Sequence, residues 1–292
     1  MNRTGLVASR LRRHGFAVLL AASVPLSGVA EEKVRAGNER VLRLMERSGI
    51  WSQIAQIGPQ SLDGLAQMQR GAKDSLGSRE AAALEAAIRE AFAADRLRTR
   101  MTEELASALD VATIDAALAW LETDLGRRIT SFEEQATSVT GGDHGEHLGP
   151  KLLAASGEPR RALFHRLAQA TRAGEVIYAI GSTVADGMFR GLALAAPQLG
   201  LDPGLVARQM AAERDAMIAE GEAEARSGFA YTYRELSDEE LTSYVEFSES
   251  AAGRRYGDAI ARSLEKVLAD AARELGERLA RDLVPPAAPN PR

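Results

Sequence analysis

The densest group of potential metal ligands in the sequence is the segment Asp143-His144-Gly145-Glu146-His147. Imidazole nitrogens and carboxylate oxygens are ligands of zinc and nickel. His144, Glu146 and His147 are therefore a candidate metal site, and a metal held there could assist hydrolysis. Metal ligands are normally fixed on rigid elements and oriented by further hydrogen bonds, whereas this segment is rich in glycine. We therefore favour a solvated polar loop over a metal site.

Glu122 and Glu249 offer a second kind of chemistry, because each follows an aromatic residue and precedes an expected helix N-cap. Paired carboxylates can perform acid–base catalysis when the fold brings them together. The same carboxylates could instead bond to the backbone or pair with arginines in the following turn, where the helix dipole disfavours cations. Those arginines are Arg127, Arg128, Arg254 and Arg255. We favour internal ion pairing, and the alternative is an external anion.

The other common catalytic motifs are absent. The chain contains no cysteine, which excludes disulfides, thiolate nucleophiles and zinc sites built on sulfur. It also has no G-x-S-x-G elbow, Walker A loop, H-E-x-x-H pair, or G-x-G-x-x-G after a strand. The sequence therefore indicates a non-enzymatic protein without a cofactor, and a metal-assisted hydrolase using His144 and His147 is the alternative.

Aromatic residues gather in the second half of the chain, although they make up only 5% of all residues. Such a cluster usually forms core, but an exposed part of it could contact a peptide or an apolar ligand. The partner we expect is therefore an envelope protein or an apolar ligand. The cluster comprises Phe229, Tyr231, Tyr233, Tyr244, Phe247 and Tyr256.

An internal repeat is the clearest signal of how the chain is organised. One set of residues recurs 127 positions later without a gap, which pairs Trp120 with Phe247, Glu122 with Glu249, Thr123 with Ser250, Gly126 with Gly253, and Arg127 with Arg254. An upstream motif, Ile54-x-x-Ile57-Gly58, recurs as Ile177-x-x-Ile180-Gly181 with an offset of 123. Two matches in the same order predict a tandem duplication.

The repeated residues have the types that begin helices. Asp110 and Ser237 are N-cap residues, and Thr123 and Ser250 offer a second N-cap further along. The pattern predicts a short helix, a tight corner and a longer helix that packs back, with Gly126 and its counterpart allowing close backbone approach. Proline is scarce between the termini, as long helices require. We therefore expect an all-α fold of two tandem, divergent copies of a roughly five-helix unit.

The first thirty residues have the pattern of a secretory signal peptide. Four arginines and no acidic residue precede or flank a nine-residue apolar run, 16–24, and small residues follow up to Ala30. That run is too short to span a bilayer. Removal of the segment changes the formal charge from −5 to −9. A mature chain this acidic is a poor partner for nucleic acid, and we expect a periplasmic protein without a transmembrane segment, cleaved after Ala30.

The expected organisation has five parts. These are a signal peptide at 1–30, a first helical unit at 31–140, a glycine-rich linker at 141–157, a second helical unit at 158–283 and a disordered proline-rich tail at 284–292.

The stretch Leu236-Ser237-x-x-Glu240-Leu241, followed by Phe247-x-x-Ser250-x-x-Gly253, resembles an uncharacterised family of exported bacterial proteins that is classed as a domain of unknown function. The family pattern has tyrosine and proline where this chain has Ser248 and Ala251, and the first copy departs further. The resemblance implies an all-helical fold and export. It implies no activity and no catalytic residues.

Overall fold

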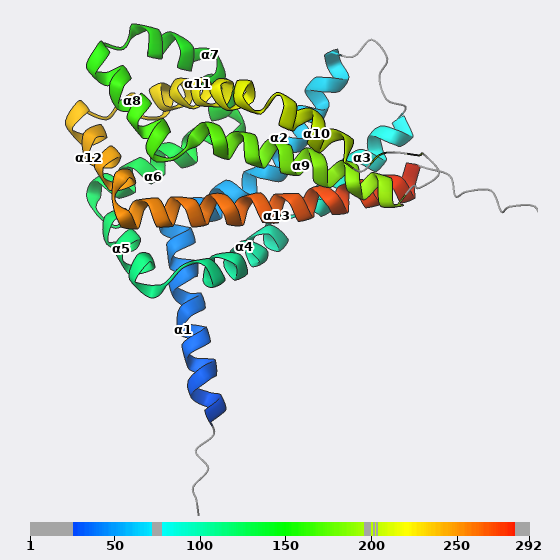
Figure 1. Ribbon diagram of the computed structural model, residues 1–292, viewed down its shortest axis with the longest axis horizontal. Helices are drawn as coiled ribbons and strands as arrows, with labels where there is room; N and C mark the ends of the chain where they lie inside the picture. The colour runs from blue at the N-terminus through cyan, green and yellow to red at the C-terminus, as the bar shows by residue number, and fades with distance from the viewer. Residues whose placement is uncertain (1–25, 72–77, 196–199, 201, 203, 284–292) are drawn as a thin grey trace, which may run out of the picture.

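The computed structural model describes residues 26–71, 78–195, 200, 202 and 204–283. Within these ranges the chain forms helices and no strand, which confirms the expected all-α fold (Figure 1). The helices are α1 (Leu26–Arg47), α2 (Ile50–Gly71), α3 (Ser78–Ala91), α4 (Ala94–Ala108), α5 (Val111–Leu121), α6 (Asp124–Ala136), α7 (Val139–Ala155), α8 (Glu158–Ala170), α9 (Ala173–Ala195), α10 (Leu205–Ala212), α11 (Arg214–Thr232), α12 (Asp238–Glu249) and α13 (Ala251–Leu283).

The sequence predicts a signal peptide at the start of the chain and a disordered tail at its end. Most of the expected signal segment 1–30 and the whole of the expected tail 284–292 lie outside the described residues. The expected cleavage position after Ala30 falls within α1. Among the described helices, none combines the length and the apolar character needed to cross a membrane.

The apolar side chains form two buried clusters. The first cluster is built by α1 to α5, and it also contains buried residues of α13, among them Val267, Ala271 and Leu275. The second cluster is built by α8, α11 and α12, and it also contains Ile129 of α6. Thus α6 contributes to the second cluster although it directly follows α5 of the first. In the same way, α13 contributes to the first cluster although it directly follows α12 of the second. Figure 1 shows α13 running along the molecule beside α9 and over α4.

The short helices α5 and α12 begin at the N-caps predicted from the sequence. The Asp110 side chain accepts a 2.7 Å hydrogen bond from the Thr113 amide and starts α5. Ser237 starts α12 with a full capping box, in which the Glu240 side chain accepts from the Ser237 amide. Such caps satisfy amides that have no partner in the first helical turn. The sequence therefore determines where both short helices begin.

The linker predicted at 141–157 is wrong, because most of that segment belongs to α7. Two of its glycines, Gly145 and Gly149, serve helix packing. A Cβ added to Gly149 would lie 2.5 Å from the Ser227 carbonyl oxygen, and one added to Gly145 would lie 3.2 Å from the Tyr231 ring. These glycines let α7 approach α11 closely, and only the short turn at Ser156 and Gly157 separates α7 from α8.

Candidate functional site

The corner between α5 and α6 meets the corner between α12 and α13 through their aromatic residues. The rings of Trp120 and Phe247 stack with centroids 4.2 Å apart and an interplanar angle of 8°. Tyr244 stacks on Trp120 at 5.3 Å, and Tyr233 meets Tyr244 edge-on at 5.5 Å. Trp120 and Phe247, which the 127-residue offset pairs, are thus in direct contact.

Both corners are closed by the same backbone geometry. The Thr123 and Ser250 hydroxyls accept hydrogen bonds of 3.0 Å from the amides of Gly126 and Gly253. A Cβ on Gly126 would clash with the Trp120 carbonyl oxygen, and one on Gly253 would clash with the corresponding oxygen of Phe247. Only glycine allows this approach, as the sequence predicted.

Arg127 and Arg254 complete the corners in matching ways. Arg127 donates to the backbone carbonyl of Glu122 and pairs with Asp124, and Arg254 donates to the backbone carbonyl of Glu249. Internal bonding of these arginines is therefore observed. Their partners are backbone oxygens and Asp124, and the carboxylates of Glu122 and Glu249 are engaged elsewhere.

Those two carboxylates each bind an arginine of an earlier helix. Arg43 of α1 donates two hydrogen bonds of 2.8 Å to Glu122. Arg166 of α8 donates to Glu249 at 3.2 and 2.8 Å, and this contact holds the pKa of the Glu249 carboxyl below its usual value. Both glutamates lie in fork-shaped ion pairs, which supports the structural interpretation.

The candidate metal ligands do not converge. His144, Glu146 and His147 are exposed on α7. Among the residues with described placement, no three histidine or acidic side chains are arranged to hold a metal ion. The metal site suggested by the spacing, and the hydrolase built on it, are therefore not favoured.

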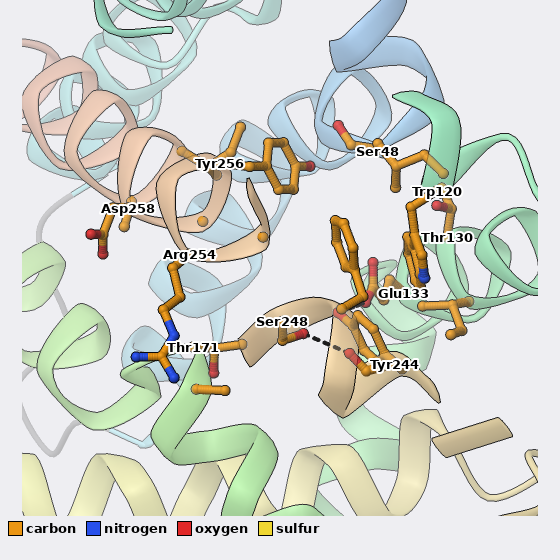
Figure 2. A pocket seen from close by; sticks show the side chains of 18 of the residues that line it. Ser48, Trp120, Thr130, Glu133, Thr171, Tyr244, Ser248, Arg254, Tyr256 and Asp258 are labelled. Atoms are coloured by element: carbon orange, nitrogen blue, oxygen red, sulfur yellow. Dashed lines mark hydrogen bonds between the residues drawn. The ribbon is translucent and has the colours of Figure 1, made fainter. Parts of the chain in front are cut away.

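Between the two corners lies a cavity of about 230 Å³, here called the junction pocket. Its walls come from the turn after α1, from the end of α8, from α5, α6, α9 and α12, and from the first half of α13 (Figure 2). Most of the lining is apolar. The lining residues are Ser48, Trp120, Leu121, Ile129, Thr130, Glu133, Ala170, Thr171, Val176, Tyr244, Phe247, Ser248, Gly253, Arg254, Tyr256, Gly257, Asp258, Ile260, Ala261 and Leu264.

The most unusual group in the junction pocket is the Glu133 carboxyl. Its Oε1 accepts hydrogen bonds from the Tyr233 hydroxyl at 2.7 Å and the Tyr244 hydroxyl at 2.9 Å. Burial disfavours the charged form and raises the pKa of Glu133 above its usual value, although both hydroxyls oppose the shift. Burial likewise raises the pKa of both tyrosines, so they remain protonated donors.

Sequence reasoning missed Glu133, although a signal for it exists. Gly126, Ile129 and Thr130 are buried on one face of α6, and Glu133 continues that face at helical spacing. A charged residue within a buried stripe indicates either a partner or a function. Three members of the aromatic cluster expected from the sequence, Tyr244, Phe247 and Tyr256, line the pocket.

Comparison with known proteins gives one match. Residues 95–154 match the family described as uncharacterized protein conserved in bacteria (DUF2059). No curated protein and no solved structure matches the chain. The DUF2059 match covers nearly all of α4, all of α5 and α6 and most of α7. It supports the resemblance to an uncharacterised bacterial family, and it lies on the first set of motif residues.

The raised pKa of Glu133 predicts how the stability of the protein changes with pH. Its folded-state pKa is raised, so above pH 4.5 the unfolded chain releases this proton before the folded chain does. The Glu133 contribution to stability therefore falls as pH rises through that window and is constant above the folded-state pKa. We expect Glu133→Gln, which can still accept from both tyrosines, to lose less stability than the wild type between pH 4.5 and neutrality.

Urea unfolding at a series of pH values measures this difference. The exposed Glu220 on α11 provides the control substitution, Glu220→Gln, which we expect to follow the wild-type curve. Identical pH profiles for the wild type and Glu133→Gln would contradict the prediction.

Proposed function

We propose that this chain is an exported, periplasmic, non-enzymatic protein that binds a small, mainly apolar ligand in the junction pocket. The observation that carries this proposal is the pocket itself, an apolar cavity with a few polar groups, which is the usual composition of ligand sites. Its volume is below the range of about 300–1,000 Å³ typical for drug-sized ligands. A cavity of about 150 Å³ can hold benzene, so the ligand is of the size of one substituted ring.

We further propose that the chain is a tandem duplication and that the pocket lies between the two copies. The ion pair of Arg43 with Glu122 matches that of Arg166 with Glu249 under the two sequence offsets. The turns after α1 and α8 also match, because Gly49 has φ of 73° and its counterpart Arg172 has φ of 51°.

The pocket walls follow the same correspondence. Residues paired by the offsets face the same cavity, which supports an origin in which two copies packed around a shared space. The wall pairs are Ser48 with Thr171, Trp120 with Phe247, Leu121 with Ser248, Ile129 with Tyr256, and Thr130 with Gly257.

Ethylbenzene is a suitable first probe, because it has the size of the proposed ligand. We expect it to bind the full chain and to be excluded by Gly257→Phe. Gly257 lines the pocket, and a Cβ added there meets no atom within 4 Å, so the larger side chain can enter the open space without a backbone clash. Gly181 on α9 has equally open surroundings outside the pocket lining, which makes Gly181→Phe the matched control.

Calorimetric titration and ligand-induced shifts in NMR spectra measure the binding. The proposal is supported if the wild type and Gly181→Phe bind ethylbenzene while Gly257→Phe does not. Equal binding of ethylbenzene to both glycine variants would overturn it.

Export rests on the arginine-rich start and the short apolar run within residues 1–30. We expect the full-length chain expressed in a Gram-negative host to be recovered in the periplasmic fraction with Glu31 as its first residue. N-terminal sequencing of that fraction checks both points. Recovery of the uncleaved chain in the cytoplasm would contradict export.

A further inference from the structure

Glu133 lacks a cationic partner inside the protein. Among the described residues, no lysine, arginine or histidine lies within ion-pair distance of its carboxylate, and its hydrogen bonds come only from the two tyrosine hydroxyls, both to Oε1. Oε2 therefore accepts no hydrogen bond from the described chain. The carboxyl therefore offers a free acceptor to a bound group, and in its ionised form it carries a negative charge that no side chain of the described residues neutralises.

The nearest basic residue of the lining is already engaged. Arg254 donates to the Glu249 carbonyl oxygen at 2.9 Å, and Figure 2 shows it on the other side of the pocket from Glu133, near Asp258. Asp258 in turn faces Arg172 and Arg262 at 3.8 and 4.0 Å. The charged side chains on that side of the pocket therefore already have partners within the protein.

Aromatic rings surround the carboxylate. Figure 2 shows Trp120, Glu133 and Tyr244 gathered on one side of the pocket, and the Phe247 ring lies against Trp120. Tyr256 also lines the pocket, and Figure 2 shows its ring beside Ser48. Trp120 stacks with both Phe247 and Tyr244, so these rings cover parts of one another's faces. An ammonium group in this space would meet the carboxylate among aromatic side chains.

We propose that the ligand of the junction pocket is a small organic amine bound as its ammonium ion, with the ammonium group donating to Glu133 Oε2 and the apolar part filling the cavity. This inference rests on the proposed ligand-binding function and specifies the ligand class. A neutral apolar ligand would leave the carboxylate without a partner, and an anion would be repelled by Glu133. An ammonium ion satisfies the unoccupied oxygen and balances the charge of the carboxylate.

Benzylammonium and ethylbenzene test the charge directly, because they differ only in an ammonium group against a methyl group. We expect the full chain to bind benzylammonium about tenfold more tightly than ethylbenzene. In Glu133→Gln this preference disappears, because the amide carries no charge, while ethylbenzene binding stays within about twofold of the wild-type value because the pocket shape is retained.

A second measurement keeps the test independent of how well the variant folds. Carbon NMR of the Glu133 side-chain carboxyl in the wild type is expected to shift on addition of benzylammonium and much less on addition of ethylbenzene. If ethylbenzene binds and benzylammonium binds no more tightly, or if the carboxyl signal does not respond, the amine proposal is overturned and the apolar pocket stands. If neither probe binds, both proposals fall.

Discussion

Replacing Gly253 with alanine is expected to destabilise the folded protein by about 3 kcal/mol, at the upper end of the range for overpacking. The new Cβ would overlap the Phe247 carbonyl oxygen, which belongs to the backbone and cannot rotate away. Relief requires the corner to open, and opening would break the hydrogen bond from the Gly253 amide to the Ser250 hydroxyl. The Trp120–Phe247 stack beside the corner would be displaced as well.

The same substitution one turn later is the matched control for Gly253→Ala. A Cβ on Gly257 meets no atom within 4 Å, and alanine in a helix interior is favoured over glycine by about 0.5–1 kcal/mol. Gly257→Ala is therefore expected to stabilise the protein slightly. Urea denaturation measures both variants. Equal stability of the two variants would contradict the steric role of the corner.

Placing a carboxylate at Ala271 is expected to destabilise the protein by about 4 kcal/mol, because it buries a charge without a partner. Ala271 is fully buried in the first cluster, although α13 follows the second cluster in the sequence. We expect amide hydrogen exchange in Ala271→Asp to accelerate first in the helices of the first cluster, α1, α4 and α5. Of these helices, α4 and α5 pack directly against α13, and α1 packs in turn against α4 and α5, so all three lie far from residue 271 along the chain.

Ala251→Asp on the same helix is the control for Ala271→Asp. Ala251 is exposed and is the first residue of α13, where a carboxylate interacts favourably with the helix dipole. The stability of the Ala251→Asp variant is expected to stay within about 0.5 kcal/mol of the wild type. Accelerated exchange confined to α11 and α12 in Ala271→Asp would count against the crossed packing of α13.

The parts of the fold that follow from local chemistry could be predicted from the sequence. The N-caps at Asp110, Thr123 and Ser237 and the corner glycines depend on neighbouring residues only, and each was placed correctly. The glycine-rich segment 141–157 was predicted as a linker but lies mostly in a helix. Glycine considered alone favours loops, whereas beside a partner helix it allows close helix packing. That partner, α11, is more than seventy residues away in the sequence.

In the candidate site, too, local features could be predicted from the sequence, whereas contacts between distant segments could not. The repeated aromatic positions, Trp120 and Phe247, were identified from spacing, but their direct contact depends on how the two corners meet. Glu133 gained its significance from Tyr233 and Tyr244, which lie on other helices and were grouped only by residue type. His144 and His147 form a dense pair in the sequence, yet both lie on the exposed surface of α7.

The exchange of α6 and α13 between the two apolar clusters has a consequence for how a ligand reaches the junction pocket. Moving α1 to α6 away from α8 to α13 would withdraw Ile129 from the second cluster and Val267 from the first, so a hinge-like opening would expose both interiors at once. The pocket is partly open, so the proposed ligand is expected to enter through local motion of wall side chains, without either cluster breaking. Such a ligand would exchange on the timescale of side-chain motion, and its release would be insensitive to the global unfolding rate.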